Sequence, residues 1–272
     1  MRRLGVGRVL FALTLIAIGL AGLATGAAGA IWQPVPRSWP LREALAYGCA
    51  VVSLGCGAGL LWRRTGPVAA GLLTAWLLVW LVAIKGRFIV AAPLAAASWE
   101  SAGETAVLLA AAGVLFVRSA AGSARRRLPA LFTGDAGLPL ARTLYGAALI
   151  AFGLAHLAYV AQTAGLVPRW LPDRSMWVYV TGFDYIAAGA AIIANAAARL
   201  AALLAALQIG LFTLLVWAPV VASGRASADD WSEAVVSWSL TAAAWVVFES
   251  YRGGARWRFA RIALRRRPRR SA

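Results

Sequence analysis

Long apolar stretches alternate with short polar connections along the whole chain. Eight stretches of roughly 18 to 22 residues contain no internal cluster of charge, and a helix of that length can cross the hydrocarbon core of a bilayer. They cover residues 9–30, 43–62, 67–84, 100–117, 143–163, 176–194, 200–219 and 232–250. The pattern predicts an all-α polytopic membrane protein with eight transmembrane helices.

The first stretch also has features of a secretory signal. Two arginines follow Met1, and the apolar run closes on the small residues Ala28, Gly29 and Ala30. The apolar core of a signal peptide is usually about 7 to 15 residues, which is shorter than this run. A membrane helix is the favoured interpretation, and a signal peptide is the alternative.

The composition excludes a soluble protein. Hydrophobic residues make up 61% of the chain and charged residues 14%, so a soluble fold could not keep the apolar surface away from water. The 27 basic residues outnumber the 10 acidic ones, and they stand in clusters between the apolar runs. This is the layout of a membrane protein whose bases mark the cytoplasmic face, so no nucleic acid partner is expected.

A shift of 134 positions aligns the chain with itself. Ten of the seventeen residues in 8–24 are identical to those in the shifted copy. In the same alignment Gly48 and Gly55 match Gly182 and Gly189, and the later parts match after a two-residue gap. We therefore expect two tandem four-helix bundles in the same orientation. The expected domains are a diverged membrane repeat (1–120), an Arg-rich cytoplasmic linker (121–141), a second membrane repeat (142–252) and a basic cytoplasmic tail (253–272).

The distribution of bases predicts the orientation. Twenty bases fall on one side of the eight stretches and seven on the other. The positive-inside rule then places both termini in the cytoplasm. The high content of Arg and Ala is typical of a GC-rich bacterial genome, so the expected location is the bacterial inner membrane.

The tail after Tyr251 carries nine arginines interrupted by apolar residues. Such a segment beside a membrane helix favours binding to anionic lipid headgroups at the bilayer surface. A plain stop-transfer tail is the alternative.

Two ionisable residues within the second repeat are candidates for chemistry. Asp184 lies inside the sixth stretch and His156 in the fifth, at similar expected depth. Their counterparts in the first repeat are Ala50 and Gly22, so the polar pair belongs to one repeat only. A carboxylate beside an imidazole favours the imidazolium and suits proton exchange or hydrogen bonding to a quinone-like carbonyl. Packing residues satisfied by their neighbours are the alternative for both.

Three further residues are included in the candidate ligand site. Tyr145 and Tyr159 lie on the same helical face as His156, and Glu233 opens the eighth stretch. Glu100 and Glu104, one turn apart in the fourth stretch, are expected at the exterior headgroups, with joining this site as the alternative. Gly48, Gly55 and Gly59 share one face of the second stretch and predict close helix packing there.

Several segments of the second repeat resemble those of a known family. The segments Phe152-Gly-Leu-Ala-His156, Val167-Pro-Arg-Trp-Leu-Pro172 and Ala187-Ala-Gly189 resemble the DoxX-like family of four-helix membrane proteins. The resemblance covers roughly residues 140–252, and the first repeat looks like a diverged partner. It implies the four-helix fold and, for some members, an association with quinone-linked redox complexes in the membrane, while no catalytic residue follows from it.

The expected function is a redox-associated accessory protein that binds a quinone or a similar lipophilic molecule and has a membrane redox partner. A small-solute or proton-coupled transporter is the first alternative, and polar residues of both repeats facing one cavity would favour it. A membrane assembly factor without chemistry is the second. The sequence assigns no reaction, and an enzyme is the less favoured class.

Overall fold

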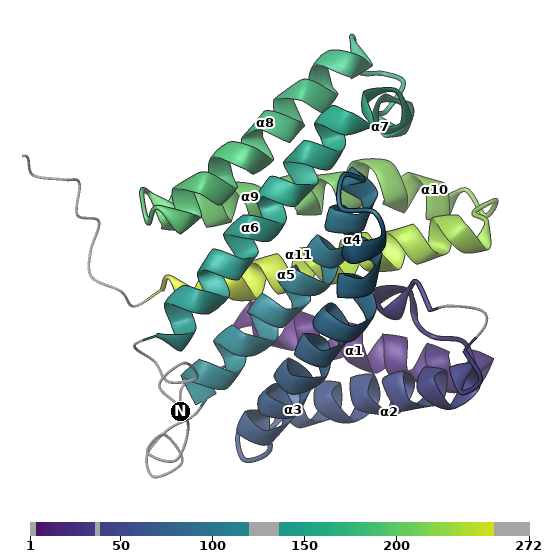
Figure 1. Cartoon of the computed structure of the whole chain (residues 1–272), viewed down its shortest axis with the longest axis vertical. Helices are drawn as coiled ribbons and strands as arrows, with labels where there is room; N and C mark the ends of the chain where they lie inside the picture. The colour runs from purple at the N-terminus through teal and green to yellow at the C-terminus, as the bar shows by residue number, and fades with distance from the viewer. Residues whose placement is uncertain (1–3, 36–38, 120–135, 253–272) are drawn as a thin grey trace, which may run out of the picture.

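The computed structural model describes residues 4–35, 39–119 and 136–252, and within these ranges all regular structure is helical (Figure 1). The first half contains α1 (Val6–Thr25), η1 (Ala30–Trp32), α2 (Arg42–Leu61), α3 (Gly66–Val79), η2 (Trp80–Lys85), α4 (Gly86–Ala91) and α5 (Ala96–Ser119). The second half contains α6 (Gly137–Ala158), α7 (Val160–Leu166), α8 (Arg174–Ile193), α9 (Ala198–Phe212), η5 (Thr213–Trp217), α10 (Ala218–Ala222) and α11 (Ala228–Ser250). The basic tail and most of the linker lie outside the described residues.

Seven helical segments in the described ranges are long and apolar enough to cross a membrane. They are α1, α2, the continuous helix from α3 to α4, α5, α6, α8 and the continuous helix from α9 to α10. The chain is thus a multi-pass membrane protein by length and composition. The sequence-based count of eight is one higher, because Glu233 and interspersed serines lower the hydropathy of α11, although this helix has 23 residues.

Two of the spanning helices contain a wider π-helical turn, η2 in the first half and η5 in the second. Pro219 follows η5 and has no N–H to donate to the preceding turn, which gives a local reason for the irregular hydrogen bonding there. The predicted stretch 67–84 was too short, because the helix continues through η2 to Ala91. The predicted stretch 143–163 was too long at its end, because α6 stops at Ala158 and a short separate helix follows.

The two halves begin with helix pairs of the same geometry, α1 with α2 and α6 with α8. A Cβ placed on Gly19 would lie 2.8 Å from the Ala50 carbonyl oxygen, and a Cβ placed on Gly153 would lie 2.5 Å from the Gly182 carbonyl oxygen. Only glycine permits such close approach of two helix backbones. Ala50 therefore occupies the position of Gly182.

This geometry corrects two predictions about the second helix. Gly57, not Gly55, lies against the first helix, 2.7 Å from the Ala12 carbonyl oxygen when a Cβ is added, whereas Gly48 and Gly55 have open space there. The two-residue gap thus precedes α2. The counterpart of Asp184 is consequently Val52 and not Ala50, because Ala50 already pairs with Gly182.

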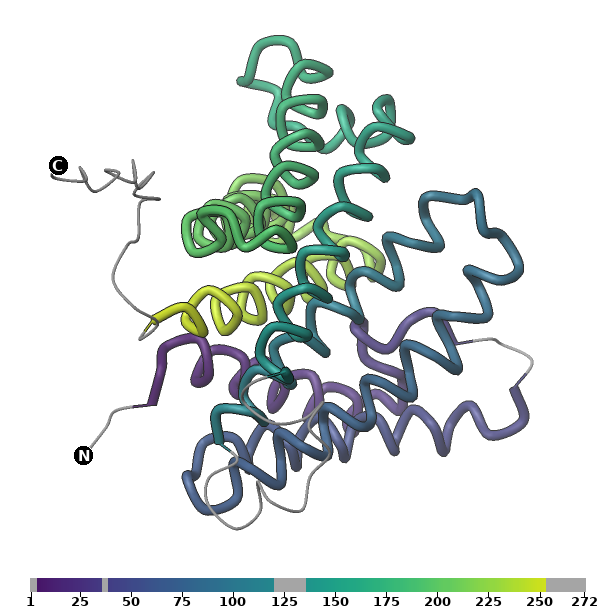
Figure 2. The backbone as a smooth tube through the Cα atoms, turned by 60° about the vertical axis from the view of Figure 1, so that its left-hand side comes forward, coloured from purple at the N-terminus to yellow at the C-terminus, as the bar shows by residue number. Residues whose placement is uncertain are grey.

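The halves meet along their last and first helices. Helix α5 packs on α6, α11 packs on α1, and α5 and α11 pack on each other. Figure 2 shows the described start of the chain in purple and the described end in yellow lying close together. The Trp238 indole N–H donates to Thr14 Oγ1 at 2.9 Å and joins α11 to α1.

Candidate functional site

An apolar cavity of about 600 Å³, here called the lipophilic cavity, lies between α8, α9 and the segment after α7. Its apolar wall includes leucines of α9 and the aromatic residues Trp170 and Trp177. Its polar lining consists of His156, Thr163, Thr181, Asp184, Tyr185 and Gln208. The volume and the mainly apolar wall with few polar groups are typical of sites for small organic ligands.

A smaller cavity of about 150 Å³, here called the acidic chamber, lies where α5, α6, α8, α9 and α11 meet. Glu100 and Glu104 enter it from α5 and Glu233 from α11. Glu104 interacts electrostatically with Glu233 and Glu100. Glu100 and Glu104 therefore share a cavity with His156, which was the alternative to a location at the exterior headgroups.

His156 belongs to the walls of both cavities, together with Tyr185, Thr163 and Phe212. Its ring packs edge-on against Tyr185 with 5.3 Å between the ring centroids. Glycine at 182 makes room for it, because a Cβ there would lie 3.1 Å from the His156 Cβ. The first half has the reverse arrangement, with Gly22 opposite Ala50.

The tautomer of His156 follows from its backbone contact. Nδ1 lies 2.8 Å from the carbonyl oxygen of Phe152. A carbonyl oxygen can only accept, so Nδ1 carries the hydrogen and Nε2 of the neutral ring is an acceptor. His156 can therefore accept a proton or a hydrogen bond at Nε2.

The predicted His156–Asp184 pair is wrong as a direct contact. Both side chains line the lipophilic cavity, but no hydrogen bond or ion pair joins them. They lie on neighbouring helices whose sequences place them at similar depth, while the aromatic ring of Tyr185 packs against the imidazole instead. His156 and Asp184 thus line the same cavity without forming a charged pair.

The other predicted site residues are divided between the site and its surroundings. Glu233 lines the acidic chamber with His156. Tyr145 is fully buried, lines neither cavity, and its hydroxyl has no hydrogen-bond partner among the described residues. Tyr159 also lines neither cavity, and its hydroxyl accepts a hydrogen bond from the Ala97 N–H at 3.3 Å.

Lys85 is a buried ionisable residue that was not expected at the site. It is the only lysine of the chain, and its side chain is 1% exposed. Nζ donates to the Gln33 carbonyl oxygen and to Ser101 Oγ at 2.6 Å, and the ammonium interacts electrostatically with Glu104. The sequence indicates that Lys85 is unusual, because it is the single lysine among 26 arginines. Its position directly after the predicted stretch 67–84 suggested a helix end and not a buried site.

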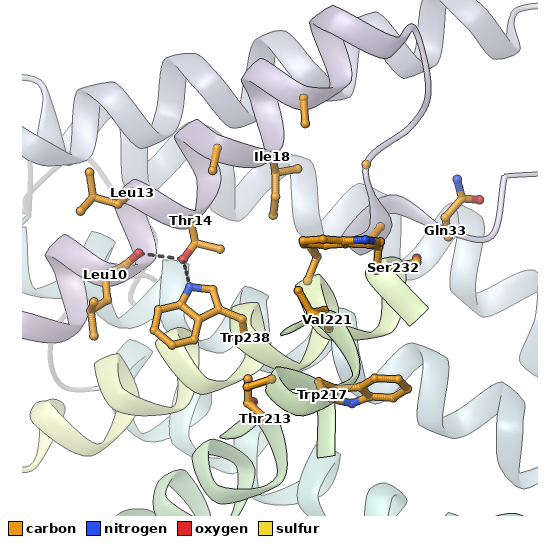
Figure 3. A pocket seen from close by; sticks show the side chains of 18 of the residues that line it. Leu10, Leu13, Thr14, Ile18, Gln33, Thr213, Trp217, Val221, Ser232 and Trp238 are labelled. Atoms are coloured by element: carbon orange, nitrogen blue, oxygen red, sulfur yellow. Dashed lines mark hydrogen bonds between the residues drawn. The ribbon is translucent and has the colours of Figure 1, made fainter. Parts of the chain in front are cut away.

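A third cavity, of about 820 Å³, lies between α1, the segment before η1, α10 and α11, and is here called the tryptophan groove (Figure 3). Figure 3 shows Trp217 and Trp238 on its walls, with the Trp238 indole hydrogen-bonded to Thr14, which itself donates to the Leu10 carbonyl oxygen. Trp217 also lines the acidic chamber and separates it from this groove. The acidic chamber thus shares wall residues with two apolar cavities.

This arrangement can bind an apolar molecule and exchange protons with it. The lipophilic cavity has mainly apolar walls, and His156 lines both this cavity and the acidic chamber with its carboxyl groups. Within the described part of the chain no three His, Cys, Asp or Glu side chains are placed to hold a metal ion.

Comparison with known proteins adds a family match for the second half alone. Residues 145–248 match a family model described as a domain of unknown function, DUF8561. No curated protein and no solved structure matches the chain. The matched region contains His156, Asp184, Tyr185 and Glu233. Because the domain has no known function, the match assigns no role to these residues.

Proposed function

We propose that the second half of the chain binds a quinone or a related lipophilic molecule in the lipophilic cavity, and that the protein is an accessory component of a membrane redox system. The observation that carries the proposal is the position of His156 in the walls of both the lipophilic cavity and the acidic chamber. A quinone and its reduced form differ in protons as well as electrons. A ligand in the lipophilic cavity would contact His156, which also lines the acidic chamber with its carboxyl groups.

The hydrogen-bonding groups of the cavity fit oxygen atoms on an otherwise apolar ligand. Trp177 lines the cavity, and its buried indole N–H has no hydrogen-bond partner among the described residues. His156 Nε2 accepts from a hydroxyl when the ring is neutral and donates to a carbonyl when the ring is protonated. The protein would thus bind both states of the ligand, while the electrons belong to a redox partner in the membrane.

The proposal includes a topology of eight membrane helices in two tandem four-helix repeats, with α11 as the eighth span and both termini in the cytoplasm of a bacterial cell. It is supported by the recurring order of helices, the equal contacts of Gly19 and Gly153, and the excess of bases at one end. The DoxX-like resemblance of residues 140–252 belongs to the same proposal.

Titration of the purified protein with a short-chain quinone tests the binding. Trp170 and Trp177 line the cavity, so binding should quench their fluorescence. Leu207→Trp would place a larger side chain in the cavity and obstruct it, and Leu200→Trp is the matched control because Leu200 lies on the same helix, is similarly exposed and does not line the cavity. We expect micromolar quenching in the wild type and the control, with loss in Leu207→Trp. Equal affinity in all three would place the ligand elsewhere.

One observation favours proton-coupled transport as a second candidate. Polar residues of both halves face the acidic chamber, Glu100 and Glu104 from the first and His156 and Glu233 from the second. A transporter built from two repeats is expected to place its site between them. Proton uptake into liposomes on addition of a solute would favour transport, whereas tight quinone binding without uptake favours the accessory role.

A further inference from the structure

A cavity of about 620 Å³ lies at the end of the bundle where the described start and end of the chain meet, away from the cavities described above. It is bounded by the start of α1, the connection between α2 and α3, the end of α5 and the end of α11. Four arginines line it: Arg8, Arg63, Arg118 and Arg252. Val114, Leu115 and Val246 form a buried apolar floor.

One acidic side chain, Glu249, lines the same cavity, and its carboxylate is already engaged. Oε1 lies 3.2 Å from the Arg252 guanidinium, and Oε2 accepts the Gly7 N–H at 3.3 Å. Of the four guanidinium charges, one is therefore compensated within the cavity. The segments 1–3, 120–135 and 253–272, which adjoin Leu4, Ser119 and Arg252 in sequence, contain many arginines and a single acidic residue, Asp135.

The guanidinium of Arg8 is held in place by the backbone. Nε donates to the Leu60 carbonyl oxygen at 2.7 Å and one terminal nitrogen donates to the Trp62 carbonyl oxygen at 3.2 Å. Arg63 is close enough to repel it electrostatically, and Arg63 makes no hydrogen bond or ion pair within the described part. Two like charges thus face one cavity without an acid between them.

The corresponding arginine of the second half has a different environment. Arg142 lies 134 positions after Arg8, and its guanidinium stacks on the Tyr251 ring at 3.8 Å and donates to the Ser250 hydroxyl and carbonyl oxygens. The chain itself covers Arg142. Among the described residues, the space in front of Arg8 is a cavity.

We propose that this cavity binds the phosphate headgroup of an anionic phospholipid, with Arg8 and Arg63 as the main phosphate contacts and the acyl chains against the apolar floor. Guanidinium groups bind phosphate through charge-assisted, often bidentate hydrogen bonds. The site lies at helix ends, which is the depth of the headgroups, and basic pockets between membrane helices are known to take such lipids. It is independent of the quinone site and of the basic tail.

Native mass spectrometry of the full chain in nanodiscs tests the proposal. The probes are nanodiscs of phosphatidylcholine alone and of phosphatidylcholine with 20% phosphatidylglycerol. Arg63→Gln removes one contact that supports no other residue, and Arg64→Gln is the matched control, because Arg64 is exposed in the same connection and does not line the cavity. We expect retained phosphatidylglycerol in the wild type and in Arg64→Gln, and about fivefold weaker retention in Arg63→Gln, from about 1 kcal/mol per base.

Two results would overturn the proposal. Equal retention by Arg63→Gln and Arg64→Gln would mean that the lipid binds by general surface charge. Displacement of phosphatidylglycerol by millimolar inorganic phosphate would mean that the cavity binds the free anion and that the apolar floor contributes nothing. Retention that resists phosphate and falls only in Arg63→Gln supports the lipid site, and an unchanged melting temperature in both variants excludes unfolding as the cause.

Discussion

His156 donates from Nδ1 to the carbonyl oxygen of Phe152, one turn earlier on α6, at 2.8 Å. This contact fixes the neutral tautomer and leaves Nε2 for a ligand or a proton. A hydrogen bond within one helix also orients the ring without help from Asp184. The chemistry proposed for the site therefore depends on His156 and does not require Asp184.

His156→Leu should weaken quinone binding about tenfold, the effect of losing one hydrogen bond of about 1 to 1.5 kcal/mol. Tyr159→Phe is the control, because Tyr159 is near the same helix end but outside both cavities. Quinone titrations of the three proteins provide the measurement. Equal weakening in the control would remove His156 from the site.

Asp184→Ala and His156→Ala should have independent effects on stability, since no hydrogen bond or ion pair joins the two side chains. The loss in the double variant should equal the sum of the single losses to within about 0.5 kcal/mol. Chemical unfolding in detergent measures all three. A smaller loss in the double variant than in Asp184→Ala would restore the charged pair.

Gly189→Ala should destabilise the protein by about 1 to 3 kcal/mol, because its Cβ would meet the Gly146 carbonyl oxygen on the facing helix. Gly55→Ala, the position aligned with it by sequence, should be neutral or stabilising, since nothing lies within 4 Å of its Cβ. Thermal unfolding in detergent compares the two. Equal melting temperatures for the variants would contradict the packing described for α6 and α8.

Lys85→Met should destabilise the protein by about 3 kcal/mol, because it removes two hydrogen bonds and leaves Glu104 without its compensating charge. Adding Glu104→Gln to Lys85→Met should recover part of the loss. The free energies of unfolding of the two single variants and the double variant give the coupling. Purely additive losses would show that the two charges act separately.

The positions of the membrane helices were predictable because hydropathy depends on local composition. The predicted start of the second helix, residue 43, lies one residue from the observed start at Arg42. The π-helical turns were not predictable in this way, because they change hydrogen bonding without changing composition. The predicted stretch 67–84 left Lys85 outside the helix, because a lysine normally marks the end of a membrane helix. In the structure Lys85 lies inside the continuous helix Gly66–Ala91.

The site was predictable only in part, because helical periodicity gives the face of a residue but not the helix that it meets. His156 and Asp184 line the same cavity, yet Tyr185 packs against the imidazole. Glu100 and Glu104 reach the same chamber because α5 of the first half packs on α6 of the second. That contact joins positions far apart in sequence, and a single sequence carries no signal for it.

The most direct test of the proposed function is mass spectrometry of the lipids that stay bound to the protein purified from native membranes. We expect a quinone in near-equal amount to the wild-type protein and to Leu200→Trp, and its loss from Leu207→Trp, in which a larger side chain obstructs the lipophilic cavity. No quinone in any preparation, or the same amount in Leu207→Trp as in the wild type, would contradict it.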